Sequence, residues 1–541
     1  MAHTSLASLF SKAYGQLQRS RRQGIPLSEL IEQEAERTQQ RRAFLRGATA
    51  VGASLALPVF AQAGDTVDAL AAARRQPRVA IIGGGMAGLT CAYRLKQKGV
   101  IATVYEATKR TGGRMYSDTT TFGYAGQACE LGGELIDTGH KTMRRMAKEF
   151  GLTLEDRDAA QVGLRDLVGH FNGRNVPYAE LLDAFVPVAE AIDNSLLDLI
   201  NINLGITYDN PNGGAALDAL SLNSWFDREG LSGLGRDLVT VAHIIEWGLD
   251  ADVMNAFDML WLISTDTRKI ELFGESDERF HIRGGNQALP RALASKLDCG
   301  QIVSERVLEQ IRQRADGTYV LTFATPGGCR EVLADQVVSA IPFKLLREVD
   351  LALDLPALKR TAINEMGFGQ NTKCMTGYNS RPWRAQGSNG ESFSDLAYQN
   401  SWDTAQAQPQ KPGKNHGILT EYTGGSRAIT AGTGSVGSHV TSFLNQINRV
   451  YPGTKPAYTG SAVRMAWNQM PYSRGSYSSY LVGQYTKFAG SEGLPVGNLR
   501  FAGEHTDPDN QGYMEGAAVS GERAAKEVLN AIRSRNLSAA G

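Results

Sequence analysis

The residues that most clearly predict chemistry form a glycine-rich turn near residue 84. Gly83, Gly85 and Gly88 have the spacing GxGxxG and directly follow the apolar run 78–82. In such a turn the first glycine permits a tight bend, the second lets the backbone approach a pyrophosphate, and the third lets a helix pack closely on the strand. Glu106 lies 21 residues after Gly85, where an acid accepts hydrogen bonds from ribose hydroxyls. The spacing therefore predicts a dinucleotide site.

Lys373 is a second residue that could do chemistry. It stands in the short run 371–375, among small and apolar residues, where an unpaired cation would be costly. We expect it to have a partner in the fold. The alternative is a lysine at a strand end whose ammonium reaches solvent.

Other kinds of catalytic or binding site are missing from the sequence. The five cysteines are scattered and form no CxxC pair, and the eight histidines show no HExxH spacing, so the sequence predicts no metal site. There is also no GxSxG turn of the kind that presents a nucleophilic serine. Lys plus Arg equals Asp plus Glu at 56 each, so no global positive field favours nucleic acid or a membrane as a partner.

The elements that must position the glycines can be placed from composition. Residues 78–82 predict a buried parallel strand, residues 89–98 a helix that ends at Gly99, and residues 101–105 a second strand ending at Glu106. Strand, glycines, helix, strand and acid in this order are typical of a Rossmann-type unit. The order does not by itself separate NAD from FAD.

Five further segments resemble the flavin-containing amine oxidases. Arg110-Thr111-Gly112-Gly113-Arg114 and Glu130-Leu131-Gly132-Gly133 are similar to that family's second flavin-contact motif, and residues 501–506 with 512–517 are similar to its C-terminal FAD signature. Residues 283–290 are similar to an element that returns the chain to the flavin domain. The resemblance spans residues 78–533. It implies a glutathione-reductase-like α/β fold, with a Rossmann-type FAD-binding domain, an α+β substrate domain and a helical insertion.

The resemblance also assigns roles to individual residues. Arg114 would lie beside the pyrophosphate or flavin ring, Glu504 would bind the ribityl chain, and the main chain of Val307 would face the adenine. A surface cation and an ordinary strand residue are the alternatives for Arg114 and Val307. The cofactor-binding residues that pattern and resemblance together predict are Gly83, Gly85, Met86, Ala87, Gly88, Glu106, Ala107, Gly113, Arg114, Gly132, Gly133, Glu134, Val307, Trp467, Gly503, Glu504, Gly512, Tyr513 and Met514.

The residues that would act on the substrate come from the same resemblance. Lys373 would hold a water against the flavin, and Tyr477 and Tyr513 would form two walls of an aromatic cage around the amine. Core packing is the alternative for either tyrosine. Monoamine oxidases carry a cysteine bonded to FAD where this chain has Ser476, so we expect non-covalent FAD.

The resemblance is greatest to bacterial L-amino acid oxidases, which implies oxidative deamination of an L-amino acid by O2 to a 2-oxo acid, ammonia and hydrogen peroxide. A substrate carboxylate should meet an arginine, but Glu134-Leu135-Ile136 stands where those oxidases carry one. A monoamine or polyamine oxidase is therefore the alternative, with Glu134 able to attract a second amino group. Glu134 could equally cap a helix or pair with Arg114. A flavin desaturase or isomerase acting on carbon-carbon bonds would be of another class.

The N-terminal extension, residues 1–77, resembles a twin-arginine export signal. Arg41-Arg42 precedes an apolar run of about 14 residues, short of the ~20 that span a bilayer, and then Ala61-Gln62-Ala63. We expect an exported, periplasmic or secreted enzyme; the alternative is a retained amphipathic helix and a cytoplasmic enzyme. We further expect a discontinuous FAD domain over 78–145, 276–341 and 470–535, a substrate domain over 146–275 and 342–469, and a homo-oligomer, namely a dimer.

Overall fold

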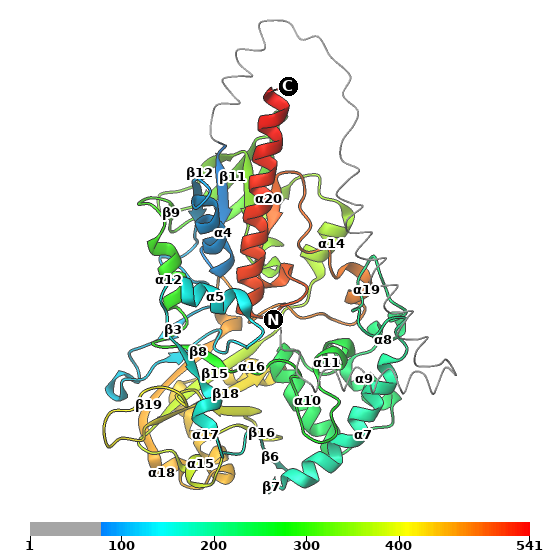
Figure 1. Cartoon of the computed structure of the whole chain (residues 1–541), viewed down its shortest axis with the longest axis vertical. Helices are drawn as coiled ribbons and strands as arrows, with labels where there is room; N and C mark the ends of the chain where they lie inside the picture. Colours follow the sequence, from blue (N-terminus) through cyan, green and yellow to red (C-terminus); the bar gives the residue numbers. More distant parts are fainter. Residues whose placement is uncertain (1–76, 541) are drawn as a thin grey trace, which may run out of the picture. The chain divides into compact units, whose positions relative to one another are not determined.

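A five-stranded parallel sheet forms the centre of the nucleotide-binding side (Figure 1). The chain is described by a computed structural model over residues 77–540, so the twin-arginine segment lies outside the described residues. The strand order is β20-β13-β1-β2-β9. All four residues of the first strand are buried, as expected for a parallel strand covered on both faces. The strands are β1 (Val79–Ile82), β2 (Ala102–Tyr105), β9 (Ile302–Val303), β13 (Gln336–Ser339) and β20 (Leu499–Phe501).

Helices cover one face of this sheet and a second sheet covers the other. The helices on the first face, α4 (Met86–Lys96) and α20 (Met514–Ala540), lie side by side in Figure 1, in blue and red, and share an apolar core with β1, β2 and β13. The second sheet has the order β12-β11-β10-β14. Its strands are β10 (Val307–Gln313), β11 (Tyr319–Ala324), β12 (Arg330–Ala334) and β14 (Asp350–Ala352).

One boundary differs from the expected domain division. Residues 343–366, which the sequence places in the substrate domain, include α13 (Phe343–Leu346) and α14 (Ala357–Glu365). Phe343, Leu346 and Ile363 are buried in the same core as Ala80, Val337 and Leu321 of the nucleotide-binding sheets. The segment therefore packs on the nucleotide-binding side, because its apolar face has its partner there.

A seven-stranded sheet forms the other side of the fold, with the order β19-β15-β18-β17-β16-β6-β7. Its strands are β6 (Val168–Phe171), β7 (Arg174–Val176), β15 (Asn371–Tyr378), β16 (Ser392–Ser394), β17 (Asn400–Asp403), β18 (Gly417–Gly424) and β19 (Tyr458–Ala466). The central strand β15 is buried along its whole length and carries Lys373. The helix α17 (Val436–Val450) packs its apolar face on this sheet.

Helices fill much of the region 176–270, whose composition predicts mainly helical structure. They bury one apolar core that includes Trp225, Phe226 and Phe257. These helices are α7 (Tyr178–Leu196), α8 (Ala215–Asp218), α9 (Leu222–Arg228), α10 (Leu234–Trp247) and α11 (Ala256–Leu262). Within the described residues, no helix is long and apolar enough to cross a membrane.

Shorter elements connect these parts. The remaining strands pair as β3 (Ser117–Asp118) with β4 (Cys129–Glu130) and as β5 (Leu154–Asp156) with β8 (Phe280–Ile282). The remaining helices are α5 (Lys141–Glu149), α6 (Arg157–Gln161), α12 (Ala288–Ser295), α15 (Pro382–Ala385), α16 (Gly425–Gly432), α18 (Thr454–Ala457) and α19 (Gln484–Phe488).

Candidate active site

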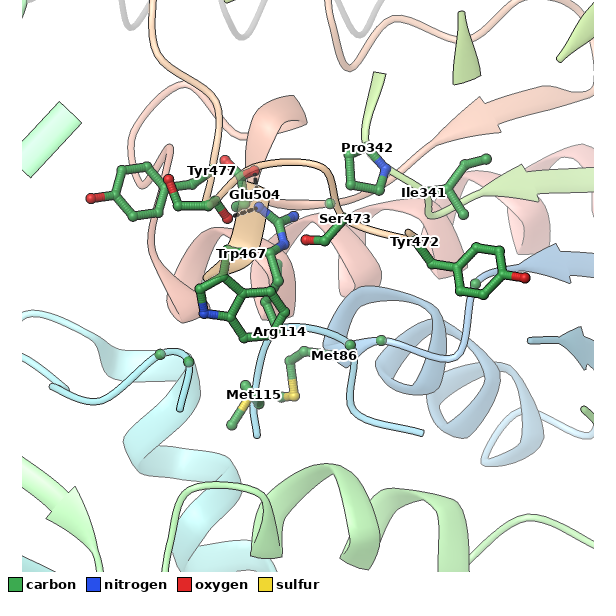
Figure 2. A pocket seen from close by; sticks show the side chains of 18 of the residues that line it. Met86, Arg114, Met115, Ile341, Pro342, Trp467, Tyr472, Ser473, Tyr477 and Glu504 are labelled. Atoms are coloured by element: carbon green, nitrogen blue, oxygen red, sulfur yellow. Dashed lines mark hydrogen bonds and ion pairs between the residues drawn. The ribbon is translucent and has the colours of Figure 1, made fainter. Parts of the chain in front are cut away.

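A cavity of about 690 Å³ brings the separate sequence motifs together (Figure 2). Its wall includes Gly85 from the glycine-rich turn, Arg114 from the second motif, Lys373 from β15, and Glu504 and Tyr513 from the C-terminal signature. Every predicted site residue lines this cavity except Gly88. The volume is in the range of cavities that enclose small ligands and cofactors.

Gly88 lies behind the wall because it is needed for packing. A Cβ atom at Gly88 would lie 2.0 Å from the carbonyl oxygen of Gly83, so only glycine lets α4 approach β1 this closely. Gly83 itself has φ +103°, a conformation that glycine adopts without strain. Both glycines thus act on the shape of the turn.

Gly85 faces open space instead. A Cβ atom there would meet only the Cα of Gly113, at 3.8 Å, so packing gives no reason for a glycine. The N-terminus of α4 begins at Met86 and has no side-chain cap. Its free N–H groups and positive dipole end suit a diphosphate.

Glu106 directly follows β2, and hydrogen bonds to the glycine-rich turn and to Thr108 fix its carboxylate. Its Oε2 accepts the Gly84 N–H at 2.8 Å, and its Oε1 accepts the backbone N–H and hydroxyl of Thr108 at 2.9 and 2.8 Å. The carboxylate lines the cavity and retains acceptor capacity for ribose hydroxyls. With Val307 farther along the wall, these residues fit a flavin dinucleotide: a diphosphate cradle, a ribose acceptor and room for two ring systems.

In the second flavin-contact motif, glycines allow the backbone to lie close to neighbouring parts of the cavity wall. A Cβ at Gly132 would lie 1.8 Å from the carbonyl oxygen of Arg114, and one at Gly133 would lie 2.8 Å from the Cγ of Met514. Trp467 closes the same wall, where its indole N–H donates to the Leu131 carbonyl at 2.7 Å. The backbone of this motif is therefore pressed between other parts of the cavity wall.

Arg114 and Glu504 form an ion pair across the cavity wall, drawn as dashed lines in Figure 2, with Nη1 2.8 Å from Oε1. Glu504 also accepts bonds from the Ser478 N–H at 3.2 Å, the Ser478 hydroxyl at 2.6 Å and the Gly512 N–H at 2.9 Å. Burial raises the pKa of Glu504, but the charge of Arg114 and these bonds hold it below its ordinary value. Most acceptor positions of the carboxylate are thus used within the protein.

Lys373 has the partner that its apolar surroundings demand. Its ammonium lies 2.8 Å from Glu134 Oε2 and 2.9 Å from the Gly132 carbonyl oxygen, and both side chains are buried. Burial raises the pKa of Glu134, but Lys373 together with hydrogen bonds from Thr404 and Trp402 holds it below its ordinary value. The third ammonium hydrogen has only the Glu130 carbonyl at 3.5 Å, which leaves it available to a water in the cavity.

Tyr477 and Tyr513 both line the cavity and both connect to the end of α10. The hydroxyl of Tyr513 donates to Glu246 Oε1 at 3.1 Å, and the hydroxyl of Tyr477 donates to the Glu246 carbonyl. A third ring, that of Tyr422, has its hydroxyl 3.0 Å from that of Tyr477. Lys373 Nζ lies 5.2 Å from the ring centroid of Trp402 and 5.7 Å from that of Tyr422, so aromatic faces surround the cation.

Three acids that the sequence did not single out line the same end of the cavity: Asp137, Glu246 and Glu278. Burial raises the pKa of Glu246 to about 7, with Asp137 adding to the rise and the Tyr513 hydroxyl opposing it. Burial also raises the pKa of Asp137 and, more strongly, that of Glu278. The sequence contains only a weak indication of these acids. Glu246 is one acid at the end of a largely apolar helix, and Asp137 follows Glu134 by three residues.

Cationic side chains neutralise this end of the cavity only in part. Among the described residues, Glu246 and Glu278 form no ion pair, although the charge of Arg157 lowers the pKa of Glu278; Asp137 lies near His140, with 3.3 Å between their side chains. Four arginines line the cavity wall: Arg110, Arg114, Arg306 and Arg474. The guanidinium groups of these arginines donate to backbone carbonyls of residues 111–115, to Glu504 and Ser476, to the carbonyls of Ser304 and Glu305, and to Glu348. The described chain thus offers the amine end of the cavity no arginine.

Comparison with known sequences gives the family. The sequence profile described as flavin containing amine oxidoreductase matches residues 86–529. The flavin-containing amine oxidase B of Canis lupus familiaris is 25% identical over 476 residues, which cover 84% of this chain and 86% of that protein. A Bacillus subtilis protein named "Putative L-amino-acid oxidase YobN" is 24% identical over 481 residues, 85% of this chain and 96% of that protein.

Solved structures share the fold. Putrescine oxidase with bound putrescine superposes with a TM-score of 0.71 at 18% identity, over 84% of this chain and 99% of that one. Cyclohexylamine oxidase from Brevibacterium oxydans IH-35A also gives 0.71, at 20% identity over 85% of this chain and 100% of that one. The expected amine oxidase fold is confirmed. Because the family profile spans residues 86–529 and the cavity fits the family's cofactor, this chain belongs to the flavin-containing amine oxidoreductase family and uses FAD.

Proposed function

We propose that this enzyme oxidises the primary amine of a small molecule that carries a second cationic group, a diamine in the first place. The observation that carries the proposal is the group of three acids, Asp137, Glu246 and Glu278, at the amine end of a cavity without an arginine there. The products would be an aldehyde, ammonia and hydrogen peroxide.

The residues around the amine suit such a reaction. Bound FAD supplies the acceptor for a hydride from the carbon that bears the amine, and O2 is the final oxidant. Tyr477 and Tyr513 would hold the neutral amine between their rings, which favours developing positive charge on its nitrogen. Lys373 would hold a water against the bound flavin, through the ammonium hydrogen that the protein leaves without a close acceptor.

The charge balance of the cavity supports a second cation. Buried carboxylates without a cationic partner are costly and lower that cost by taking up protons, which is the reason that burial raises the pKa of Glu246 to about 7. An ammonium group placed among Glu246, Asp137 and Glu278 would replace those protons. Glu134 is a weaker candidate for this role than its position in sequence suggested, because its carboxylate is already bonded to Lys373, Trp402 and Thr404.

A basic L-amino acid is the second candidate substrate. It also carries a distal cation, and the likeness to a Bacillus subtilis protein named as an L-amino-acid oxidase favours it. Its carboxylate would need a donor other than an arginine in the described cavity wall. Neutral L-amino acids fit least well. Their carboxylate would lie near three acids, and their side chain carries no second cation to balance that charge.

A peroxide assay on the FAD-loaded enzyme tests the proposal. The panel contains putrescine and cadaverine, butylamine and pentylamine as monoamines of matched length, and basic, neutral and acidic L-amino acids. We expect kcat/KM for a diamine to exceed that of the matched monoamine by at least about tenfold, equivalent to about 1.4 kcal/mol of differential binding. Equal values, or turnover of neutral amino acids alone, would refute the second-cation site.

A pair of variants shows whether the acids cause the preference. Glu246→Gln removes one charge and retains the size of the side chain, so it should raise KM for diamines and leave KM for monoamines nearly unchanged. Glu365→Gln is the matched control, because Glu365 pairs with Lys487 on the surface, outside the cavity wall. The same loss for mono- and diamines in Glu246→Gln would assign that residue a structural role instead.

A further inference from the structure

The strands that carry Lys373 and Tyr422 present a second set of reactive side chains on their opposite face. Successive side chains of a strand point to opposite sides of the sheet. Lys373 pairs in register with Tyr422, and both line the cavity; Cys374 pairs with Glu421, one residue further along. Cys374 and Glu421 therefore lie behind the sheet, where α17 covers them and adds His439.

These three side chains lie close enough to share an ion. The Cys374 sulfur, a Glu421 carboxylate oxygen and a His439 ring nitrogen all lie within 4.8 Å of one another. His439 Nε2 is 2.7 Å from Glu421 Oε2. The Glu421 side chain is 4% exposed and that of His439 is 17% exposed, so the cluster is buried but can be reached from solvent beside α17.

Their chemistry suits zinc. A thiolate, an imidazole and a carboxylate are the ligand types that Zn²⁺ takes in proteins, and His439 can bind it through the nitrogen that now faces Glu421. Two anions and one Zn²⁺ would form a neutral buried group. The nearby Arg464 is engaged with the carbonyl oxygens of Ala431, Thr433 and Gly434, at 2.7 to 3.0 Å.

Binding of an ion would deprotonate the ligands. Cysteine and glutamate bind metal ions as thiolate and carboxylate, so Zn²⁺ would replace their protons. Water would fill the fourth position, on the side of His439 that is open to solvent.

We propose that Cys374, Glu421 and His439 form a binding site for Zn²⁺ that connects α17 to strands β15 and β18. The three residues are far apart in sequence, so they form no short sequence motif of metal ligands. The site lies behind the sheet and takes no part in amine oxidation. Its effect would be to fix the strand that carries Lys373.

Zinc retention by the FAD-loaded enzyme tests this site. The protein is treated with excess Zn²⁺, loosely bound ion is removed by gel filtration, and zinc per FAD is measured. We expect about one zinc more in the wild type than in Cys374→Ala. Cys91→Ala, which removes another buried thiol in the core beneath α4, should retain as much zinc as the wild type.

His439→Gln separates metal binding from folding. The glutamine amide can still donate to Glu421, so the fold should survive, but the imidazole ligand is lost and the bound zinc with it. Cobalt provides a second readout: Co²⁺ should give a thiolate-to-metal absorption band in the difference spectrum between wild type and Cys374→Ala, and raise the unfolding temperature of the wild type alone. No zinc in the wild type, or equal zinc in wild type, Cys374→Ala and His439→Gln, would overturn the proposal.

Discussion

The ammonium of Lys373 lies 2.8 Å from a carboxylate oxygen of Glu134, and both side chains are buried in the cavity wall. The pair joins the centre of the seven-stranded sheet to the second flavin-contact motif. Because both groups are buried, each depends on the other, and the pair holds the lysine ammonium in the cavity wall.

Replacing Lys373 by Met should reduce turnover and stability together. Loss of the group that holds the water should slow flavin reduction by at least about 100-fold, while FAD stays bound. Glu134 is then left buried without its partner, which should destabilise the fold by about 3–5 kcal/mol. Stopped-flow absorbance and thermal unfolding measure the two effects.

The double variant Lys373→Met/Glu134→Gln is the control. It removes both charges, so it should recover part of the lost stability and none of the turnover. Wild-type flavin reduction in Lys373→Met would remove Lys373 from the active site.

Binding of a diamine should strengthen as the pH rises through about 7. Burial raises the pKa of Glu246 to about 7, so its carboxylate is mostly neutral below that pH and charged above it, where it can bind an ammonium group. The groups that face it are Tyr513, Tyr477, Asp137 and Glu278.

The measurement is the ratio of kcat/KM for putrescine to that for butylamine across pH 6 to 8.5. The ratio cancels the requirement, common to both substrates, for a neutral reacting amine. It should rise with pH in the wild type and flatten in Glu246→Gln; a flat ratio in the wild type would count against the acid subsite.

Replacing Glu106 by Ala should weaken FAD binding by about tenfold or more, equivalent to about 1.4 kcal/mol. The change removes both the ribose acceptor and the acceptor for the Gly84 N–H. Thr108→Val removes one partner of Glu106 and retains the carboxylate, so its effect should be smaller. Equilibrium dialysis against free FAD measures both, and unchanged affinity in Glu106→Ala would contradict the ribose role.

FAD should leave the protein on denaturation. Ser476 stands where monoamine oxidases bond FAD to a cysteine, and its hydroxyl donates to Asn371 Oδ1 at 2.5 Å. A serine cannot form the thioether. After acid precipitation and filtration the yellow colour should be in the filtrate; a yellow pellet would indicate covalent attachment.

The nucleotide site could be predicted from sequence because its parts are local. Gly83, Gly85, Gly88 and Glu106 lie within one strand-turn-helix-strand unit, in which Gly88 is required by its close approach to Gly83 and Gly85 leaves the cavity side of the turn open. The family could be predicted because several flavin-contact motifs follow one another along the chain in the order typical of flavin-containing amine oxidases. Lys373 could be identified by that resemblance, and its need for a partner by the cost of a buried cation.

The substrate end of the cavity and the partners of its residues were decided by tertiary structure. Glu246 comes from α10, Glu278 from the segment before β8 and Asp137 from the segment before α5, and they converge only when the helices pack against the FAD side. The same holds for Cys374, Glu421 and His439. Local pattern records how a side chain relates to its own helix or strand; whether two distant carboxylates share a cavity depends on packing between elements, which no single segment encodes.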